Sequence, residues 1–122
     1  MDFKKGQTIY EQIAELVCEK ILTEEWKADN KILSVRELAA EIEVNPNTIM
    51  RAYSQLQDDG IIYNKRGIGF FVANGAKQLI EKRNKKMFIE QDLPLVFKKI
   101  ELLNLPFSEI ESRYKQFIKK KK

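Results

Sequence analysis

Apolar residues recur at intervals of three and four along residues 8–25, the spacing that places side chains on one face of an α-helix. Thr8 precedes the first of them and offers a hydroxyl oxygen that commonly caps a helix N-terminus. The pattern predicts a first helix over residues 8–25, with Cys18 as a small packing residue at the edge of its apolar stripe. This stripe comprises Ile9, Ile13, Leu16, Val17 and Ile21.

Two capping signals predict two further helices, separated by a short turn. Ser34 and Glu37 match a capping box, in which each side chain accepts a hydrogen bond from the backbone amide of the other residue. Asn45 is a favoured N-cap, and Pro46 suits the first helical position because no amide donor is needed there. Gly60 provides a stop for the third helix, and the last two helices together form a helix-turn-helix unit.

Short runs of β-branched and aromatic residues at residues 61–65 and 70–72 predict two strands. Between them, Gly67 and Gly69 accept the positive φ angles that a hairpin turn requires. Three helices followed by a β-hairpin are the parts of a winged helix. We therefore expect an α+β fold class, with a winged helix-turn-helix domain over residues 1–75.

The chain after this domain has a purely helical pattern. One helix with a broad apolar side is expected to break or kink at Pro94, which has no amide hydrogen to donate. A turn at residues 104–106 precedes a last helix, for which Ser108 and Glu111 match a second capping box. We expect residues 119–122 to form a frayed, solvated tail.

The all-α segment, residues 76–122, has more apolar side chains than its short helices can cover within one chain. Because an exposed apolar patch of that size usually marks an interface, the pattern predicts a homodimer. The alternative is that the segment folds back on the winged helix of its own chain. The expected interface residues are Leu79, Met87, Phe88, Leu95, Val96, Ile100, Leu103, Phe107, Ile110, Tyr114 and Phe117.

Charge is unevenly distributed along the chain. The sequence has 22 Lys and Arg residues against 18 Asp and Glu residues, which gives a formal net charge of +4. Residues 1–75 contain nine basic and twelve acidic residues, a net charge of −3, whereas residues 76–122 carry +7. The winged helix is therefore slightly acidic, and binding to nucleic acid depends on where its individual basic side chains point.

The composition excludes several kinds of active site. One cysteine and no histidine rule out an internal disulfide, the usual zinc centres and histidine-dependent nucleophiles. The acidic residues leave a carboxylate enzyme formally open, but none lies beside a glycine-rich phosphate loop. We expect no catalysis, no metal and no cofactor.

No stretch of the sequence reaches the roughly 18 apolar residues that a membrane span requires. Residues 1–6 lack the apolar core of a signal peptide. These observations predict a cytoplasmic protein with no membrane partner.

Polar side chains at the start of the third helix have the chemistry to read DNA, because this part of a helix-turn-helix enters the major groove. Asn47 has the amide geometry for two hydrogen bonds with an adenine edge, and Arg51 can bond guanine or phosphate. Thr48 can donate to a phosphate or contact a thymine methyl group. The alternative is that Asn47 and Thr48 only help to cap the helix and that Arg51 is solvated. These side chains lie off the expected core stripe of Ile49, Ala52, Tyr53 and Leu56.

Arg36 and the hairpin supply further candidate contacts. The helix macrodipole disfavours a cation in the first turn, so Arg36 is expected to face a phosphate, with an ion pair to a carboxylate as the alternative. Lys65 and Arg66, beside the backbone amides of Gly67 and Gly69, suit phosphate or minor-groove contact. An ordinary hairpin with solvated charges is the alternative there.

Several motifs occur in continuous order between residues 8 and 73. They are Ile9-Tyr10-Glu11-Gln12-Ile13, Ser34-Val35-Arg36-Glu37-Leu38-Ala39, Asn47-Thr48, and Gly60-Ile61-Ile62 with Arg66-Gly67-Ile68-Gly69-Phe70-Phe71-Val72. Together they resemble the GntR family of bacterial transcription regulators. The turn Asn45-Pro46-Asn47-Thr48 and the short helical segment after the wing resemble the YtrA branch of that family. Members of that branch typically dimerise through the appended helices and often repress operons for ATP-driven membrane transporters.

The resemblance implies a sequence-specific, dimeric repressor of transcription that binds double-stranded DNA, and it marks Arg36 as a DNA contact. A two-fold dimer would present two reading helices one DNA turn apart and bind a palindromic operator. Many family members carry arginines where this chain has Pro46 and Met50, so those two contacts do not transfer. Other departures are at Ala28-Asp29, Leu33 and Phe70.

Two questions stay open at this point. A winged helix can also act as a protein-interaction adaptor without specific DNA binding, which the acidic character of residues 1–75 favours. Polar side chains at Asn47, Thr48 and Arg51 oppose that alternative, because an adaptor would present apolar anchors there. The helical segment is too short for the metabolite pocket of larger family members, and the sequence identifies no small-molecule effector.

Overall fold

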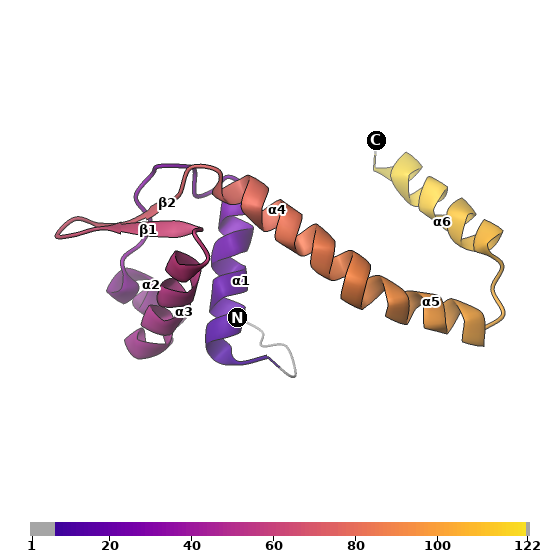
Figure 1. Ribbon diagram of the computed structural model, residues 1–122, viewed down its shortest axis with the longest axis horizontal. Helices are drawn as coiled ribbons and strands as arrows, with labels where there is room; N and C mark the ends of the chain where they lie inside the picture. Colours follow the sequence, from indigo (N-terminus) through magenta and orange to yellow (C-terminus); the bar gives the residue numbers. More distant parts are fainter. Residues whose placement is uncertain (1–6, 122) are drawn as a thin grey trace. The chain divides into compact units, whose positions relative to one another are not determined.

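The computed structural model describes residues 7–121, so the first six residues, considered above for a signal peptide, lie outside the described part (Figure 1). The chain divides into two compact units, with the boundary between Arg83 and Asn84. Three helices and a two-stranded sheet come first, and further helices follow. This arrangement confirms the predicted α+β fold class.

Helix α1 (Ile9–Leu22) begins where the sequence predicts. The hydroxyl oxygen of Thr8 accepts a hydrogen bond from the Glu11 amide at 3.2 Å. Two members of the predicted stripe are not buried: Ile9 in the first turn is exposed and Leu16 is half-buried. The rest of the stripe enters the core, and the buried residues of α1 are Gln12, Ile13, Val17, Cys18 and Ile21.

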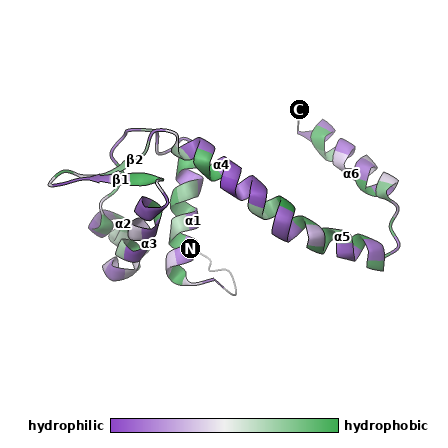
Figure 2. Ribbon diagram, viewed as in Figure 1, coloured by the Kyte–Doolittle hydropathy of each residue, from purple (hydrophilic) through white to green (hydrophobic). Residues whose placement is uncertain are grey.

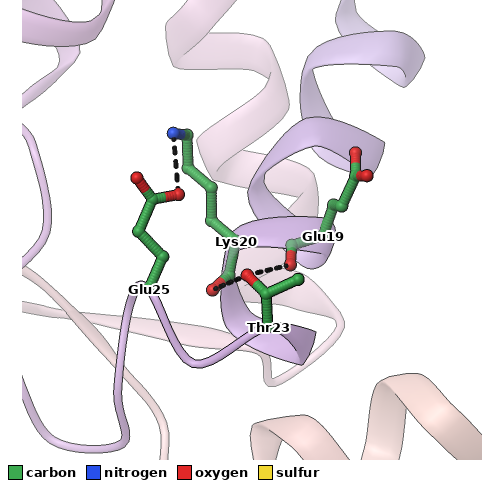
Figure 3. A network of polar contacts seen from close by, with 4 residues as sticks. All are labelled: Glu19, Lys20, Thr23 and Glu25. Carbon is green, nitrogen blue, oxygen red and sulfur yellow. Dashed lines mark hydrogen bonds and ion pairs between the residues drawn. The ribbon is translucent and has the colours of Figure 1, made fainter.

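Helix α1 ends earlier than predicted, at Leu22, and the backbone leaves the helical conformation at Glu24, whose φ is 62°. The Thr23 hydroxyl donates to the carbonyl oxygens of Glu19 and Lys20, at 3.0 and 3.3 Å (Figure 3). Glu25, which the sequence pattern placed in the helix, lies beyond it, and its carboxylate pairs with Lys20 Nζ at 3.2 Å.

The capping box predicted for the second helix is complete in α2 (Val35–Ile42). The Glu37 amide donates to Ser34 Oγ at 3.1 Å, and the Ser34 amide donates to Glu37 Oε1 at 2.8 Å. The hydrogen bond from the Ser34 amide, followed by the interaction with the Ser34 hydroxyl, favours the ionised carboxylate and holds the pKa of Glu37 below its ordinary value. The helix ends at Glu43, whose φ of 56° turns the chain towards the next helix.

Helix α3 (Pro46–Asp58) completes the predicted helix-turn-helix. Asn45 Oδ1 accepts a hydrogen bond from the Asn47 amide at 2.8 Å, while Pro46 fills a position that needs no donor. After the helix, Gly60 has a φ of 77°, a left-handed conformation that glycine adopts without a steric cost. Both ends of α3 are thus set by the residues predicted to set them.

Strands β1 (Ile62–Lys65) and β2 (Gly69–Val72) form the predicted antiparallel hairpin, with Lys65 opposite Gly69. The turn uses glycine where the backbone requires it, since φ is 80° at Gly67 and 143° at Gly69. The segment before α2 adds to this hairpin through an isolated antiparallel bridge between Lys31 and Phe71. The wing is therefore held by backbone pairing at its base.

The core of the first unit fixes the inner side of α3. Tyr53 is fully buried, and its hydroxyl donates to the Leu33 carbonyl at 2.7 Å. Burial raises the pKa of Tyr53, so the phenol stays protonated and keeps this hydrogen bond. Its ring meets the Phe70 ring edge-on, with centroids 5.0 Å apart, which joins α3 to the wing. The buried residues of α3 are the predicted stripe of Ile49, Ala52, Tyr53 and Leu56.

Helix α4 (Ala76–Met87) contributes its first part to this core, so the first unit continues beyond residue 75. Ile80 is fully buried. Arg83 Nη1 pairs with Asp59 Oδ2 at 3.5 Å, and Arg83 Nη2 donates to Cys18 Sγ at 3.3 Å. These contacts connect the start of α4 to the end of α3 and to α1.

Of the two outcomes expected at Pro94, a break or a kink, the break does not occur, because the helix continues through the proline. Helix α4 continues into a π-helical segment, η1 (Phe88–Asp92), and then into α5 (Leu93–Leu102). Proline has no amide hydrogen and its ring crowds the carbonyl one turn earlier. The wider π-helical turn relieves this crowding, and the Leu93 amide donates to the Phe88 carbonyl instead.

Helix α6 (Phe107–Lys120) does not use the second predicted capping box. Its N-cap is Pro106, and no side chain caps the helix. Because the helix begins before Ser108, the hydroxyl of that residue lies inside the first turn, and Glu111 pairs with a lysine one turn further along. The helix runs on to Lys120, so residues 119 and 120 of the expected frayed tail are helical, and both are exposed.

Figure 2 colours each residue by hydropathy, and the helices of both units carry apolar and polar residues side by side. Within residues 7–121, no helix combines the length and the apolar character needed to cross a membrane.

Candidate nucleic-acid interface

The N-terminal turns of α3 present polar side chains at the surface of the first unit. Asn47 and Arg51 are exposed and Thr48 is half-buried, whereas Ile49 between them is fully buried. The capping oxygen of α3 belongs to Asn45, so the start of the helix does not depend on the Asn47 side chain. The polar end of α3 therefore faces outward on a helix whose other side is fixed in the core.

Arg51 stacks on an aromatic ring from α1. Its Cζ lies 4.4 Å from the centroid of the Tyr10 ring, well inside the range of a cation–π interaction. The contact with the ring leaves Arg51 exposed, so its N–H donors can still reach a ligand. Tyr10 lies in one of the motifs quoted above, but its spacing predicts no such role, because the contact joins residues of two helices that are far apart in the sequence.

Arg36 is exposed in the first turn of α2. Across residues 7–121, no carboxylate lies within ion-pair distance of its guanidinium. The alternative of an ion pair thus finds no support in this part of the chain.

The wing carries an ordered stack of side chains. Lys65 Nζ lies 4.6 Å from the centroid of the Phe71 ring, and Phe71 stacks on Tyr63 with centroids 5.5 Å apart and an interplanar angle of 17°. The Tyr63 hydroxyl donates to Asp29 Oδ1 at 3.3 Å. Desolvation, together with the Asp29 carboxylate, raises the pKa of Tyr63 and keeps this donor protonated. The stack of Tyr63 and Phe71 thus positions the Lys65 ammonium over the Phe71 ring.

The remaining wing candidates lie at the tip of the hairpin. Arg66 and Gly67 are exposed, and Gly69 is half-buried. The Ile68 amide donates to the Lys65 carbonyl at 2.9 Å and closes the turn. The structure thus brings the four predicted wing residues together at one end of the hairpin.

One large apolar residue of α3 stands where many family members carry an arginine, and the sequence assigned it no contact with DNA. Met50 is 45% exposed, although it is a large apolar side chain. Its spacing of three residues from Asn47 was the available signal, because that spacing places both side chains on one face of a helix.

The second unit has no buried interior of its own. None of residues 84–121 is buried, although this part of the chain is rich in apolar side chains. Of the residues predicted at a dimer interface, Ile100 and Ile110 are half-buried and the others are exposed. Leu79 belongs to the first unit and the other ten to the second. Apolar residues that the prediction left out are also exposed, namely Ile89, Phe97, Leu102 and Leu105.

No cluster of three or more potential metal ligands occurs in the described residues. The geometry is instead that of a winged-helix DNA-binding protein, with an outward-facing second helix in its helix-turn-helix and a basic hairpin tip. Residues 9–72, more than half of the chain, match the bacterial regulatory proteins of the gntR family. The chain therefore belongs to the GntR family of DNA-binding transcriptional regulators.

Individual relatives extend the similarity beyond the winged helix. A GntR-family putative transcriptional regulator from Bacteroides thetaiotaomicron has a crystal structure that matches with a TM-score of 0.82 at 43% identity, covering 94% of this chain and 100% of that one. A GntR family transcriptional regulator from Listeria monocytogenes matches at 34% identity with a TM-score of 0.75, covering 93% and 98% of the two chains. The HTH-type transcriptional repressor YtrA of Bacillus subtilis is 38% identical over 91 residues, which cover 75% of this chain and 70% of that protein.

Proposed function

We propose that the chain is a dimeric repressor that binds a palindromic operator through α3 and the wing. The observation that carries this proposal is the polar, outward-facing N-terminal end of α3. Asn47 and Arg51 are exposed there, while Tyr53 and Ile49 hold the opposite side of the helix in the core. An ordered polar helix end of this kind fits the major groove of DNA.

The side chains of α3 read the bases. Asn47 forms two hydrogen bonds with an adenine edge, and Arg51 bonds guanine or a phosphate. Thr48, which is half-buried, donates to a phosphate or touches a thymine methyl group. These contacts give the protein its sequence preference.

The remaining basic residues position the protein on the DNA backbone. Arg36 in the first turn of α2 neutralises a phosphate. Lys65 and Arg66 contact phosphates or the minor groove, and the backbone amides of Gly67 and Gly69 lie beside them. These contacts increase the affinity for any duplex, whatever its sequence, and contribute little to sequence preference.

The second unit forms the dimer interface. This proposal is supported by the burial pattern, since none of residues 84–121 is buried. The apolar side chains of the second unit therefore have no interior to fill within one chain. A two-fold pairing of these faces would cover them and place the two copies of α3 about 34 Å apart, one turn of DNA. The operator is accordingly an inverted repeat.

Repression is the regulatory outcome that we propose. The relative YtrA of Bacillus subtilis, 38% identical over 91 residues, is named a transcriptional repressor. The resemblance to the YtrA branch extends the proposal to an operon for an ATP-driven membrane transporter. An operator that overlaps the promoter of a transporter operon would support both repression and this choice of operon.

A protein-interaction adaptor is the second candidate function. The net charge of −3 in residues 1–75 favours it, because an acidic surface repels DNA at long range. This candidate predicts negligible affinity for any duplex.

Selection of bound duplexes from a random pool, with the full chain, tests the proposed function. We expect enrichment of an inverted repeat whose half-sites are about 10 base pairs apart. In mobility-shift assays, this selected operator should bind at least about 10³-fold more tightly than a scrambled duplex. A pool from which nothing is enriched would contradict specific binding and favour the adaptor.

Sedimentation of the full chain tests the dimer. The wild-type chain should sediment as a dimer, and Phe117→Lys should shift it towards the monomer by placing a charge in an apolar face. Gln116→Lys is the matched control, because it adds the same charge to a polar position of α6. A monomeric wild-type chain would contradict the proposal.

A further inference from the structure

The polar surface of α3 contains one large apolar side chain. Met50 is 45% exposed, three residues after Asn47 and directly before Arg51. Side chains three residues apart share a helix face, so Met50 lies beside Asn47 and not in the core stripe. An apolar side chain therefore lies in the middle of the surface that faces DNA.

The fold of the first unit does not require Met50. The core stripe of α3 is complete without it, since Ile49, Ala52 and Tyr53 are each fully buried and Leu56 is 1% exposed. Exposed apolar surface costs free energy in water, so a ligand that covers Met50 gains affinity. The position of Met50 between two DNA-facing residues indicates that this ligand is the operator.

We infer that Met50 is a specificity-determining residue that contacts the 5-methyl group of a thymine in the major groove. The thymine methyl group is the apolar feature that base pairs present in this groove. Methionine is unbranched and polarisable, so it adapts to such a contact. The inference rests on the proposed function and adds an apolar contact to the hydrogen bonds of Asn47.

The helix geometry places this thymine close to the base that Asn47 reads. Three residues advance an α-helix by about 4.5 Å, which is similar to the step of about 3.4 Å between successive base pairs. The thymine is therefore next to the base pair that Asn47 contacts, once in each half-site.

Replacement of single thymines by deoxyuridine tests this contact, because deoxyuridine lacks only the methyl group. The probe is the operator selected from the random pool, with each thymine replaced in turn in both half-sites. At one symmetric pair of positions, the substitution should weaken binding of the wild-type chain. Loss of one buried methyl group reduces the affinity about fourfold in each half-site, so the two half-sites together should lose about fifteenfold. Met50→Ala should lose nothing further at that pair and should respond like wild type at all other thymines.

Two variants serve as controls. Met50→Leu keeps an apolar side chain of similar size and should keep the sensitivity to deoxyuridine. Ile9→Ala removes an apolar side chain of similar exposure from α1 and should also leave the sensitivity unchanged. Alanine at an exposed helix position favours the helix, and thermal unfolding verifies that each variant is folded.

The inference is overturned if wild type and Met50→Ala respond equally to deoxyuridine at every thymine. It is also overturned if Met50→Ala weakens selected and scrambled duplexes to the same degree. Failure of the proposed function is a different result, because no duplex would then be enriched from the pool. That result would overturn both.

Discussion

Arg51 of α3 lies with its Cζ 4.4 Å from the centroid of the Tyr10 ring in α1. The pair joins a residue proposed to contact DNA to the first helix of the domain. A cation–π interaction at a partly exposed site stabilises by about 0.5–1 kcal/mol. That is comparable to the cost of immobilising one long side chain on binding, so the ring can order Arg51 before DNA arrives.

Tyr10→Leu is therefore expected to weaken binding to the selected operator by about 0.5–1 kcal/mol, because the ring that orders Arg51 is lost. Tyr10→Phe keeps the ring and should bind nearly as tightly as wild type. Mobility shifts with both variants measure the difference. Equal losses in the two variants would assign the effect to the hydroxyl and not to the stack.

Asn47→Ala should cost about 1–3 kcal/mol of operator binding and relax the preference at one base pair, since two hydrogen bonds to a base edge are lost. Binding to a scrambled duplex should change little. Ser54→Ala, a change at an exposed position further along α3, is the matched control. If Asn47→Ala weakened both duplexes equally, Asn47 would not be a base-reading residue.

Lys65→Ala should weaken binding to all duplexes by a similar factor, because a phosphate contact does not depend on sequence. A plot of the logarithm of affinity against the logarithm of salt concentration has a negative slope, and its magnitude should decrease by about one. Titrations at two salt concentrations measure this slope. Lys119→Ala, which removes an exposed lysine from α6, should leave the slope unchanged.

Glu37 makes the stability of the fold depend on pH in a defined window. The Ser34 amide and hydroxyl hold the pKa of Glu37 below its ordinary value of 4.5. A lowered folded-state pKa means that the ionised carboxylate favours folding, so this contribution is fully present above pH 4.5 and is lost as the pH falls through the folded-state value. Wild type should accordingly lose thermal stability more steeply below pH 4.5 than Glu37→Gln does. Parallel curves for the two proteins would contradict this.

The sequence predicted the winged helix well because its boundaries are set by local interactions. Ser34 with Glu37, and Asn45 with Pro46, act on amides within three residues, so their spacing alone identifies them. Gly60 is equally local, because its role depends on its own φ.

Residue spacing did not determine three other features of the structure. Pro94 was expected to break or kink a helix, and a π-helical turn accommodates it without a break. Ser108 matched a capping box, but the helix begins earlier, after Pro106. The stack of Arg51 on Tyr10 could not be predicted, because it depends on how α1 and α3 pack.

The burial of Cys18 has a practical consequence. Cys18 is the single cysteine of the chain, it is 3% exposed, and burial raises the pKa of its thiol. A shielded, protonated thiol does not react with iodoacetamide until the surrounding structure opens. The rate of alkylation at this one atom therefore reports how often the domain opens, and operator DNA should slow that rate by favouring the closed form.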